Sequence, residues 1–178
     1  MSDSLNTSIS NSSTTITSLS DNVSFINEKL IQKIYTVLEK VIKLNNSNSS
    51  NSQKNKNIFN CDEIPNISLY NYLFRIQKYL SVEDNTLILA LIYIDRICKD
   101  GKYMINNYNI HKILFVAIIL AIKFNEDIYY TNNYFAQIGG VSSGELEKME
   151  IRFAFAIQFN FYFEKSLYDQ YYNYINKI

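Results

Sequence analysis

Residues 113–122 form an uninterrupted apolar run, Ile-Leu-Phe-Val-Ala-Ile-Ile-Leu-Ala-Ile, and this run constrains the fold more than any other part of the chain. Its length and its two alanines favour a helix over a strand, and Asn109 is placed to cap that helix. The run is shorter than the roughly 20 apolar residues that cross a bilayer. Because such a helix is apolar on every side, other helices must enclose it. We therefore predict a buried central helix.

The composition favours one all-α domain around that helix. The chain has 178 residues and is 47% hydrophobic, which suffices for a single core. One proline and four glycines leave few chain breaks, and this favours long helices. The 17 acidic and 17 basic residues cancel, so there is no excess of positive charge for binding phosphate groups. We expect no nucleic-acid partner.

The cysteines and the N-terminus indicate an intracellular protein. Cys61 and Cys98 are too few for a metal cluster or a disulfide framework, so we interpret both as reduced thiols. The N-terminus lacks the basic start and the apolar core of a signal peptide. We expect a location in the nucleus, the cytoplasm or both, with no membrane association, metal, cofactor or small-molecule ligand.

Patterning divides the chain into five parts. Residues 1–23 are rich in Ser, Asn and Thr and are predicted to be disordered, because they cannot bury enough apolar surface. Apolar residues spaced three and four apart predict an amphipathic helix at 24–44 that packs on the rest of the protein. An Asn- and Ser-rich linker follows at 45–60, the compact part covers 61–165, and a short C-terminal helix covers 166–178.

The compact part is predicted to contain five helices. Besides the central helix, apolar spacing indicates helices at 69–80, 86–99, 134–138 and 142–160. Ser68 or Asn66 is expected to cap the first of them. Ser81 with Asp84, and Ser142 with Glu145, have the spacing of capping boxes at the starts of two others.

No catalytic constellation can be assembled from the sequence, so we do not expect an enzyme. There is no phosphate-binding Gly-rich loop, and no Ser or Cys has an evident base. The single histidine, His111, is interpreted as a solvated residue in the first turn of the central helix and is assigned no role.

Charged residues in otherwise apolar helices carry more information. Asp95 lies in a helix with little polar surface, and an unpaired buried carboxylate is costly, so we predict a structural ion pair with Arg75. Lys123 ends the central helix, and Glu150 follows the core residue Met149. Patterning alone leaves open whether Lys123 and Glu150 are solvated or form an internal pair.

The region from about 64 to 163 resembles a cyclin box, the five-helix fold of the cyclins that activate cyclin-dependent protein kinases. Three segments match its second, third and fifth helices: Tyr93-Ile94-Asp95-Arg96, Ala121-Ile122-Lys123-Phe124 and Met149-Glu150. Within the family the chain is similar to the P/U-type group, through Tyr72-Leu73-Phe74-Arg75-Ile76, Tyr108-Asn109-Ile110-His111-Lys112 and Tyr134-Phe135-Ala136-Gln137-Ile138-Gly139-Gly140-Val141-Ser142. The resemblance implies one five-helix box with an extra N-terminal helix and a short C-terminal helix.

The resemblance also implies a binding site. In the family, a lysine and a glutamate at the positions of Lys123 and Glu150 hold the kinase backbone next to its αC helix, which places both residues on one exposed face. The residues that would form the apolar surroundings of that contact are Phe124, Ala154, Phe159 and Phe161.

Three departures from the family pattern limit which properties of the family can be assigned to this chain. The substrate-docking patch of cell-cycle cyclins is not reproduced in the first box helix. The arginine that usually pairs with the Asp95 position is absent, so Arg75 is assigned that part. Glu147 stands where the P/U group usually has Asn.

The resemblance therefore implies a non-catalytic subunit that activates a cyclin-dependent kinase, in cell division or in nutrient-linked signalling. One alternative is a cyclin-fold module similar to transcription factor IIB that binds nucleic acid, although the zero net charge disfavours it. Another is a helical scaffold without a kinase partner.

Overall fold

The computed structural model describes residues 26–48, 57–127 and 129–178. These residues contain helices and no strand, so the predicted all-α fold is confirmed. The predicted disordered tail at 1–23 lies outside the described residues. The seven helices of the described part are α1 (Glu28–Asn48), α2 (Leu69–Leu80), α3 (Asp84–Cys98), α4 (Ile110–Asn125), α5 (Asn132–Gly139), α6 (Ser143–Ala156) and α7 (Lys165–Asn176).

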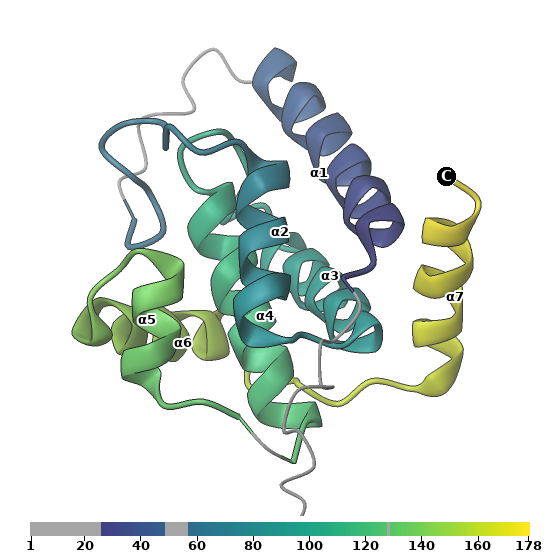
Figure 1. Ribbon diagram of the computed structural model, residues 1–178. Helices are drawn as coiled ribbons and strands as arrows, with labels where there is room; N and C mark the ends of the chain where they lie inside the picture. The colour runs from purple at the N-terminus through teal and green to yellow at the C-terminus, as the bar shows by residue number, and fades with distance from the viewer. Residues whose placement is uncertain (1–25, 49–56, 128) are drawn as a thin grey trace, which may run out of the picture.

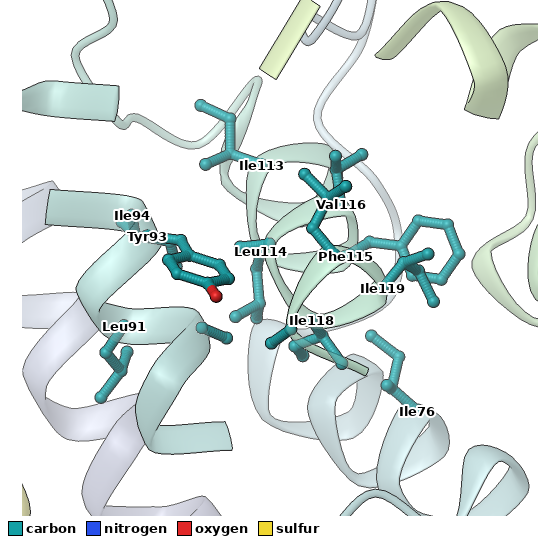
Figure 2. Close-up of a cluster of buried hydrophobic side chains, with 14 of the residues drawn as sticks. Ile76, Leu91, Tyr93, Ile94, Ile113, Leu114, Phe115, Val116, Ile118 and Ile119 are labelled. Atoms are coloured by element: carbon teal, nitrogen blue, oxygen red, sulfur yellow. The ribbon is translucent and has the colours of Figure 1, made fainter. Parts of the chain in front are cut away.

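Helix α4 is the centre of the fold, as predicted. Every residue from Ile110 to Ile122 is buried except Lys112. Side chains of α2, α3 and α4 meet in one core, where the Tyr93 ring points toward Leu114 (Figure 2). Helix α5 also approaches closely, since a Cβ atom at Gly139 would stand 2.3 Å from the Phe115 ring. The apolar run is therefore enclosed as its composition requires.

Helices α1 and α7 lie on the side of the molecule away from α5 and α6 (Figure 1). Helix α1 packs on α2, α7 packs on α3, and α1 and α7 contact each other. The Lys33 ammonium of α1 donates to the carbonyl oxygens of Ile175 and Asn176, at 3.2 and 3.0 Å. A cation is favourable there because the carbonyls at a helix C-terminus carry partial negative charge. The predicted N-terminal and C-terminal helices thus both pack on the box.

The predicted linker at 45–60 is wrong at both ends. Helix α1 continues to Asn48, and the Asn45 side chain donates to the Ile105 carbonyl at 2.9 Å. Phe59 is fully buried, with edge-to-face contacts to Tyr103 and Phe153. Composition averaged over the segment hid this one aromatic anchor, whose burial outweighs the polar residues around it. Residues 49–56 lie outside the described part.

The expected helix caps are confirmed in two cases. The Ser68 hydroxyl accepts from the Asn71 amide at 3.2 Å, and the Ser142 hydroxyl accepts from the Glu145 amide at 3.1 Å. The predicted capping box at Ser81 is wrong. Ser81 has a left-handed backbone, with φ of 50°, and ends α2 instead of starting α3. Asn109 stands at the N-cap of α4, but its side-chain oxygen accepts from the Asn106 amide instead of from a helix amide.

The predicted ion pair between Asp95 and Arg75 is also wrong. Asp95 is exposed and accepts a hydrogen bond from the Tyr171 hydroxyl of α7. Arg75 instead donates to the Gln137 carbonyl at 3.3 Å. Although α3 is largely buried, Asp95 lies on its narrow open side, so no buried cation was needed. Burial first, and then the Asp95 hydrogen bond, raise the pKa of Tyr171, so the tyrosine remains a donor at neutral pH.

This correction changes the expected cost of removing the carboxylate. We expect Asp95→Ala and Tyr171→Phe each to lower the free energy of unfolding by about 1.5–3 kcal/mol, the usual value of one hydrogen bond to a charged group, instead of the roughly 3–5 kcal/mol of a broken buried ion pair. The two effects should be non-additive, whereas Asp95→Ala and Arg75→Ala should be additive. Urea unfolding of the two double-mutant cycles measures this. Strong coupling between Asp95 and Arg75 would show that these two residues form the ion pair that the sequence predicted.

The interpretation of His111 as solvated is wrong. Its side chain is buried, with Nε2 at 3.0 Å from the Ile67 carbonyl and the ring 5.1 Å from the Tyr72 ring, centroid to centroid. Its Nδ1 atom has no hydrogen-bond partner among the described residues. The central helix is covered even at its first turn, because the loop before α2 folds over it. Burial lowers the pKa of His111.

We expect this histidine to make the fold acid-sensitive. The unfolded chain takes up a proton near its ordinary pKa of about 6.5, while the folded chain resists protonation to lower pH. Stability should therefore fall as the pH drops from about 7.5 to about 5.5. His111→Gln retains a donor for the Ile67 carbonyl but cannot titrate, so it should lose part of this pH dependence. Denaturant unfolding at both pH values compares the two proteins, and identical pH profiles would contradict the assignment.

Candidate partner-binding face

The structure brings Lys123 and Glu150 together at one end of the core. Lys123 is in the last turn of α4 and Glu150 is in α6, and the distance from Nζ to Oε1 is 2.5 Å. Asn132, the first residue of α5, completes the group. Its side-chain oxygen accepts from Lys123 Nζ at 2.6 Å, and its amide nitrogen donates to Glu150 Oε2 at 3.1 Å. Of the two possibilities that patterning left open, the structure has the internal pair.

The geometry of this group leaves capacity for a further partner. The two side chains of the pair are 21% and 11% exposed, so the group is partly covered and still reaches solvent. A lysine ammonium has three donors, and Glu150 and Asn132 occupy two of them within the described residues. Lys123 Nζ also lies 5.9 Å from the centre of the Phe135 ring. The pair can thus offer a fixed donor and carboxylate oxygens with spare lone pairs to an outside backbone.

Of the four predicted apolar neighbours, two are exposed and two lie beneath the surface. Phe124 and Phe159 are 56% and 59% exposed. Ala154 and Phe161 are buried, and the Phe161 ring stacks on Phe124 with 3.8 Å between centroids. The two buried residues therefore support the exposed ones.

Sequence reasoning missed three residues of this region. Ile151 and Phe155 are 59% and 62% exposed on α6, and the Phe155 ring contacts Phe159 with 5.0 Å between centroids. Their spacing of four residues, off the buried stripe of the helix, was a signal that an unpaired apolar face exists. Asn132 carries no sequence signal for its contacts. We call Phe124, Ile151, Phe155 and Phe159 the outer apolar face.

The chain turns sharply after α6, which ends at Ala156 and not near residue 160 as predicted. Gln158 and Phe159 both have left-handed backbones, with φ of 56° and 54°. This conformation costs roughly 1–2 kcal/mol for each residue with a Cβ atom. The Phe159 amide donates to the Ala154 carbonyl at 2.8 Å, which closes the turn.

Two side chains of helix α3 form hydrogen bonds with this turn. The Tyr93 hydroxyl donates to the Phe161 carbonyl at 3.0 Å, and Arg96 Nη1 donates to the Asn160 carbonyl at 2.6 Å. Tyr93 is fully buried, and burial raises the pKa of its hydroxyl, which therefore stays protonated. Two carbonyls of the turn are thus satisfied by side chains of the second box helix.

Neither a metal site nor a membrane-spanning helix is found in the described part of the chain. Residues 26–48, 57–127 and 129–178 contain no group of three or more His, Cys, Asp and Glu side chains arranged to hold a metal ion. None of the described helices is both long enough and apolar enough to cross a membrane. The two cysteines are free thiols, and burial raises the pKa of Cys98 to about 11.

Comparison with known proteins identifies similar chains. Cyclin-U2-2 of Arabidopsis thaliana is 35% identical over 124 residues, which cover 69% of this chain and 54% of the relative. Cyclin-U4-1 of the same plant is 31% identical over 153 residues, covering 84% and 75%. The PHO85 cyclin-like protein psl1 of Schizosaccharomyces pombe is 33% identical over 153 residues, covering 78% and 63%. The chain thus spans about half the length of the Cyclin-U2 proteins.

These relatives confirm the P/U-type resemblance read from the motifs. The family model described as Cyclin matches residues 28–161, from the first residue of α1 to the phenylalanine that stacks on Phe124. The matched region contains the Lys123–Glu150 pair and the whole outer apolar face. The chain therefore belongs to the cyclin family.

Proposed function

We propose that this cyclin is a regulatory subunit, without catalytic activity of its own, that binds and activates a cyclin-dependent protein kinase. The observation that carries the proposal is the partly exposed Lys123–Glu150 pair, each member of which is followed in the chain by an exposed residue of the outer apolar face, Phe124 and Ile151. The pair has spare hydrogen-bonding capacity, and the face has apolar area that no described residue covers. The proposed cellular role is in cell division or nutrient-linked signalling, in the nucleus, the cytoplasm or both.

The proposed mechanism is a shift between two kinase states. A kinase of this class is active only when a glutamate of its αC helix pairs with the lysine of strand β3. A cyclin that binds this αC-in state more tightly raises its population. Moving the equilibrium from 1:99 to 99:1 requires about 5.5 kcal/mol of differential binding. The two charged residues would hold the backbone beside αC, and the outer apolar face would bury area against the helix itself.

The prearranged geometry of the pair favours such a role. Asn132 fixes both charged side chains before any partner arrives, so less side-chain freedom is lost on binding. Burying an exposed phenylalanine contributes about 1.5–3 kcal/mol, so contacts that the outer apolar face makes only in the αC-in state would supply energy on the scale that activation requires. Zero net charge supports a protein partner over the alternative of a nucleic-acid-binding module.

The pair is tested by replacing both residues with neutral ones of similar size. Lys123→Met with Glu150→Gln removes both charges without stranding either, and the amide oxygen introduced by Glu150→Gln can still accept from Asn132. We expect kinase binding to weaken by about 2 kcal/mol or more, the cost typical of central contacts, while the melting temperature changes little. Isothermal calorimetry with recombinant cyclin-dependent kinases of the same organism, beside thermal melts, measures both quantities.

The control is a second Lys–Glu pair in the same chain. Lys43 and Glu39 form an exposed ion pair on α1, with 2.8 Å between Nζ and Oε2. Lys43→Met with Glu39→Gln changes the same charges away from the proposed face and should leave kinase affinity unchanged. Equal affinities for wild type and the Lys123→Met, Glu150→Gln variant would contradict the mechanism. Failure of wild type to bind any kinase of the panel would favour the scaffold alternative.

The outer apolar face gives a separate prediction. Phe155→Ser should weaken kinase binding strongly and change stability little, because the side chain is 62% exposed in the free protein. Leu44→Ser is a matched control, since Leu44 is 63% exposed on α1. Activation of kinase turnover by increasing cyclin concentration compares the variants. The same half-activating concentration for Phe155→Ser and Leu44→Ser would exclude Phe155 from the interface.

A further inference from the structure

The turn after α6 is closed by backbone hydrogen bonds, including the one from the Phe159 amide to the Ala154 carbonyl, but it also contains strained residues. Gln158 and Phe159 are adjacent, neither is glycine, and both have positive φ. Such residues persist in this conformation only where surrounding structure determines it. The turn nevertheless presents Phe159 to solvent and sets Phe161 under Phe124, so its geometry shapes the outer apolar face. Further constraint on the turn comes from another element of the fold.

Helix α3 supplies it through two side chains on one side of the helix. Tyr93 and Arg96 are three residues apart, a spacing that places them next to each other on the helix surface. The Arg96 guanidinium lies 5.9 Å from the centre of the Tyr93 ring. From there the two side chains donate to the successive carbonyls of Phe161 and Asn160. Donors spaced in this way fix both the position and the direction of the turn.

Tyr93 also connects the turn to the end of α4. Its hydroxyl accepts from the Asn125 side-chain amide at 3.5 Å, and Asn125 directly follows Phe124. The Tyr93 ring contacts the Phe161 ring edge to face, with 5.6 Å between centroids. One buried phenol therefore contacts both segments that carry the stacked rings of Phe124 and Phe161.

We propose that Tyr93 and Arg96 are positioning residues for the kinase-binding face, holding the turn at 158–161 so that Phe159 is presented and Phe161 supports Phe124. This inference rests on the proposed function for its consequence in binding. The two residues act through the turn, and the effect of Arg96 on a partner should therefore require Phe159.

The first test uses the free protein and needs no kinase. Arg96→Met removes the donor to the Asn160 carbonyl and keeps a long apolar side chain. Hydrogen bonds from charged donors are strong, so we expect the amides of Phe159 and Asn160 to exchange with solvent about tenfold faster in the variant, with a melting temperature only about 3–6 °C lower. Lys99→Met, at an exposed basic residue next to the end of α3, is the control for lost charge. Unchanged exchange in Arg96→Met, or equal acceleration in Lys99→Met, overturns the proposal.

The second test measures coupling to Phe159 in kinase binding. We expect Arg96→Met to weaken affinity about tenfold in the wild-type background and less than about twofold in the Phe159→Ala background. An equal loss in both backgrounds shows that Arg96 does not act through Phe159 and overturns the proposal. Tyr93→Phe, which keeps the buried ring and loses the donor, should show the same dependence on Phe159.

The two proposals fail in different ways. If Phe159→Ala binds kinase as tightly as wild type, the kinase face proposed above is wrong at that residue, and the exchange experiment still decides whether Arg96 holds the turn. If the amides of Phe159 and Asn160 exchange at the same rate in Arg96→Met as in wild type, the positioning role is wrong. This holds even when Phe159→Ala abolishes kinase binding.

Discussion

The enclosure of α4 is the constraint on which the rest of the structure depends. Because this helix is apolar on all sides, α2, α3, α5 and α6 must surround it, and the loop before α2 must cover even its first turn at His111. The charged C-terminal end is where the helix reaches solvent. Lys123 stands there on the most deeply buried helix of the described part, which gives its ammonium group a fixed position for a partner.

Sequence reasoning predicted the features that periodicity determines and could not predict those that depend on single contacts. The helices, the buried run and the packing of α1 and α7 all follow from apolar spacing. Phe59 was missed because one aromatic residue in a polar segment leaves no periodic signal. The partner of Asp95 was predicted wrongly because the orientation of one residue on a nearly apolar helix depends on where α7 packs. Patterning left the Lys123–Glu150 pair as one of two possibilities, and the family resemblance placed both residues on one face, since spacing alone does not reveal which helix ends meet.

The segment at 93–96 shows that neighbouring residues of one sequence motif can lie on different sides of a helix and therefore have different roles. Tyr93 and Arg96 share one side of α3 and contact the turn after α6, whereas Asp95 points elsewhere and binds Tyr171 of α7. A 3.6-residue period separates these roles by geometry: positions three apart are neighbours, and adjacent positions are not. The same four residues therefore connect the box to the C-terminal helix and to the proposed partner face, through different atoms and in different directions.

The strained turn and the partly exposed Lys123–Glu150 pair are both explained by what they cost in the isolated protein and what they provide on binding. A chain selected only for stability would favour glycine at Gln158 and a fully solvated or fully apolar site at Glu150. Two left-handed residues instead cost free energy in the isolated protein, and that cost recurs whether or not a partner is present. What the cost provides is a turn with little freedom left to lose on binding, just as Asn132 has already oriented the charged groups of Lys123 and Glu150. The stacked rings of Phe161 and Phe124 connect the turn to the residue that follows Lys123, so rigidity in one of these costly features supports the other before a partner binds.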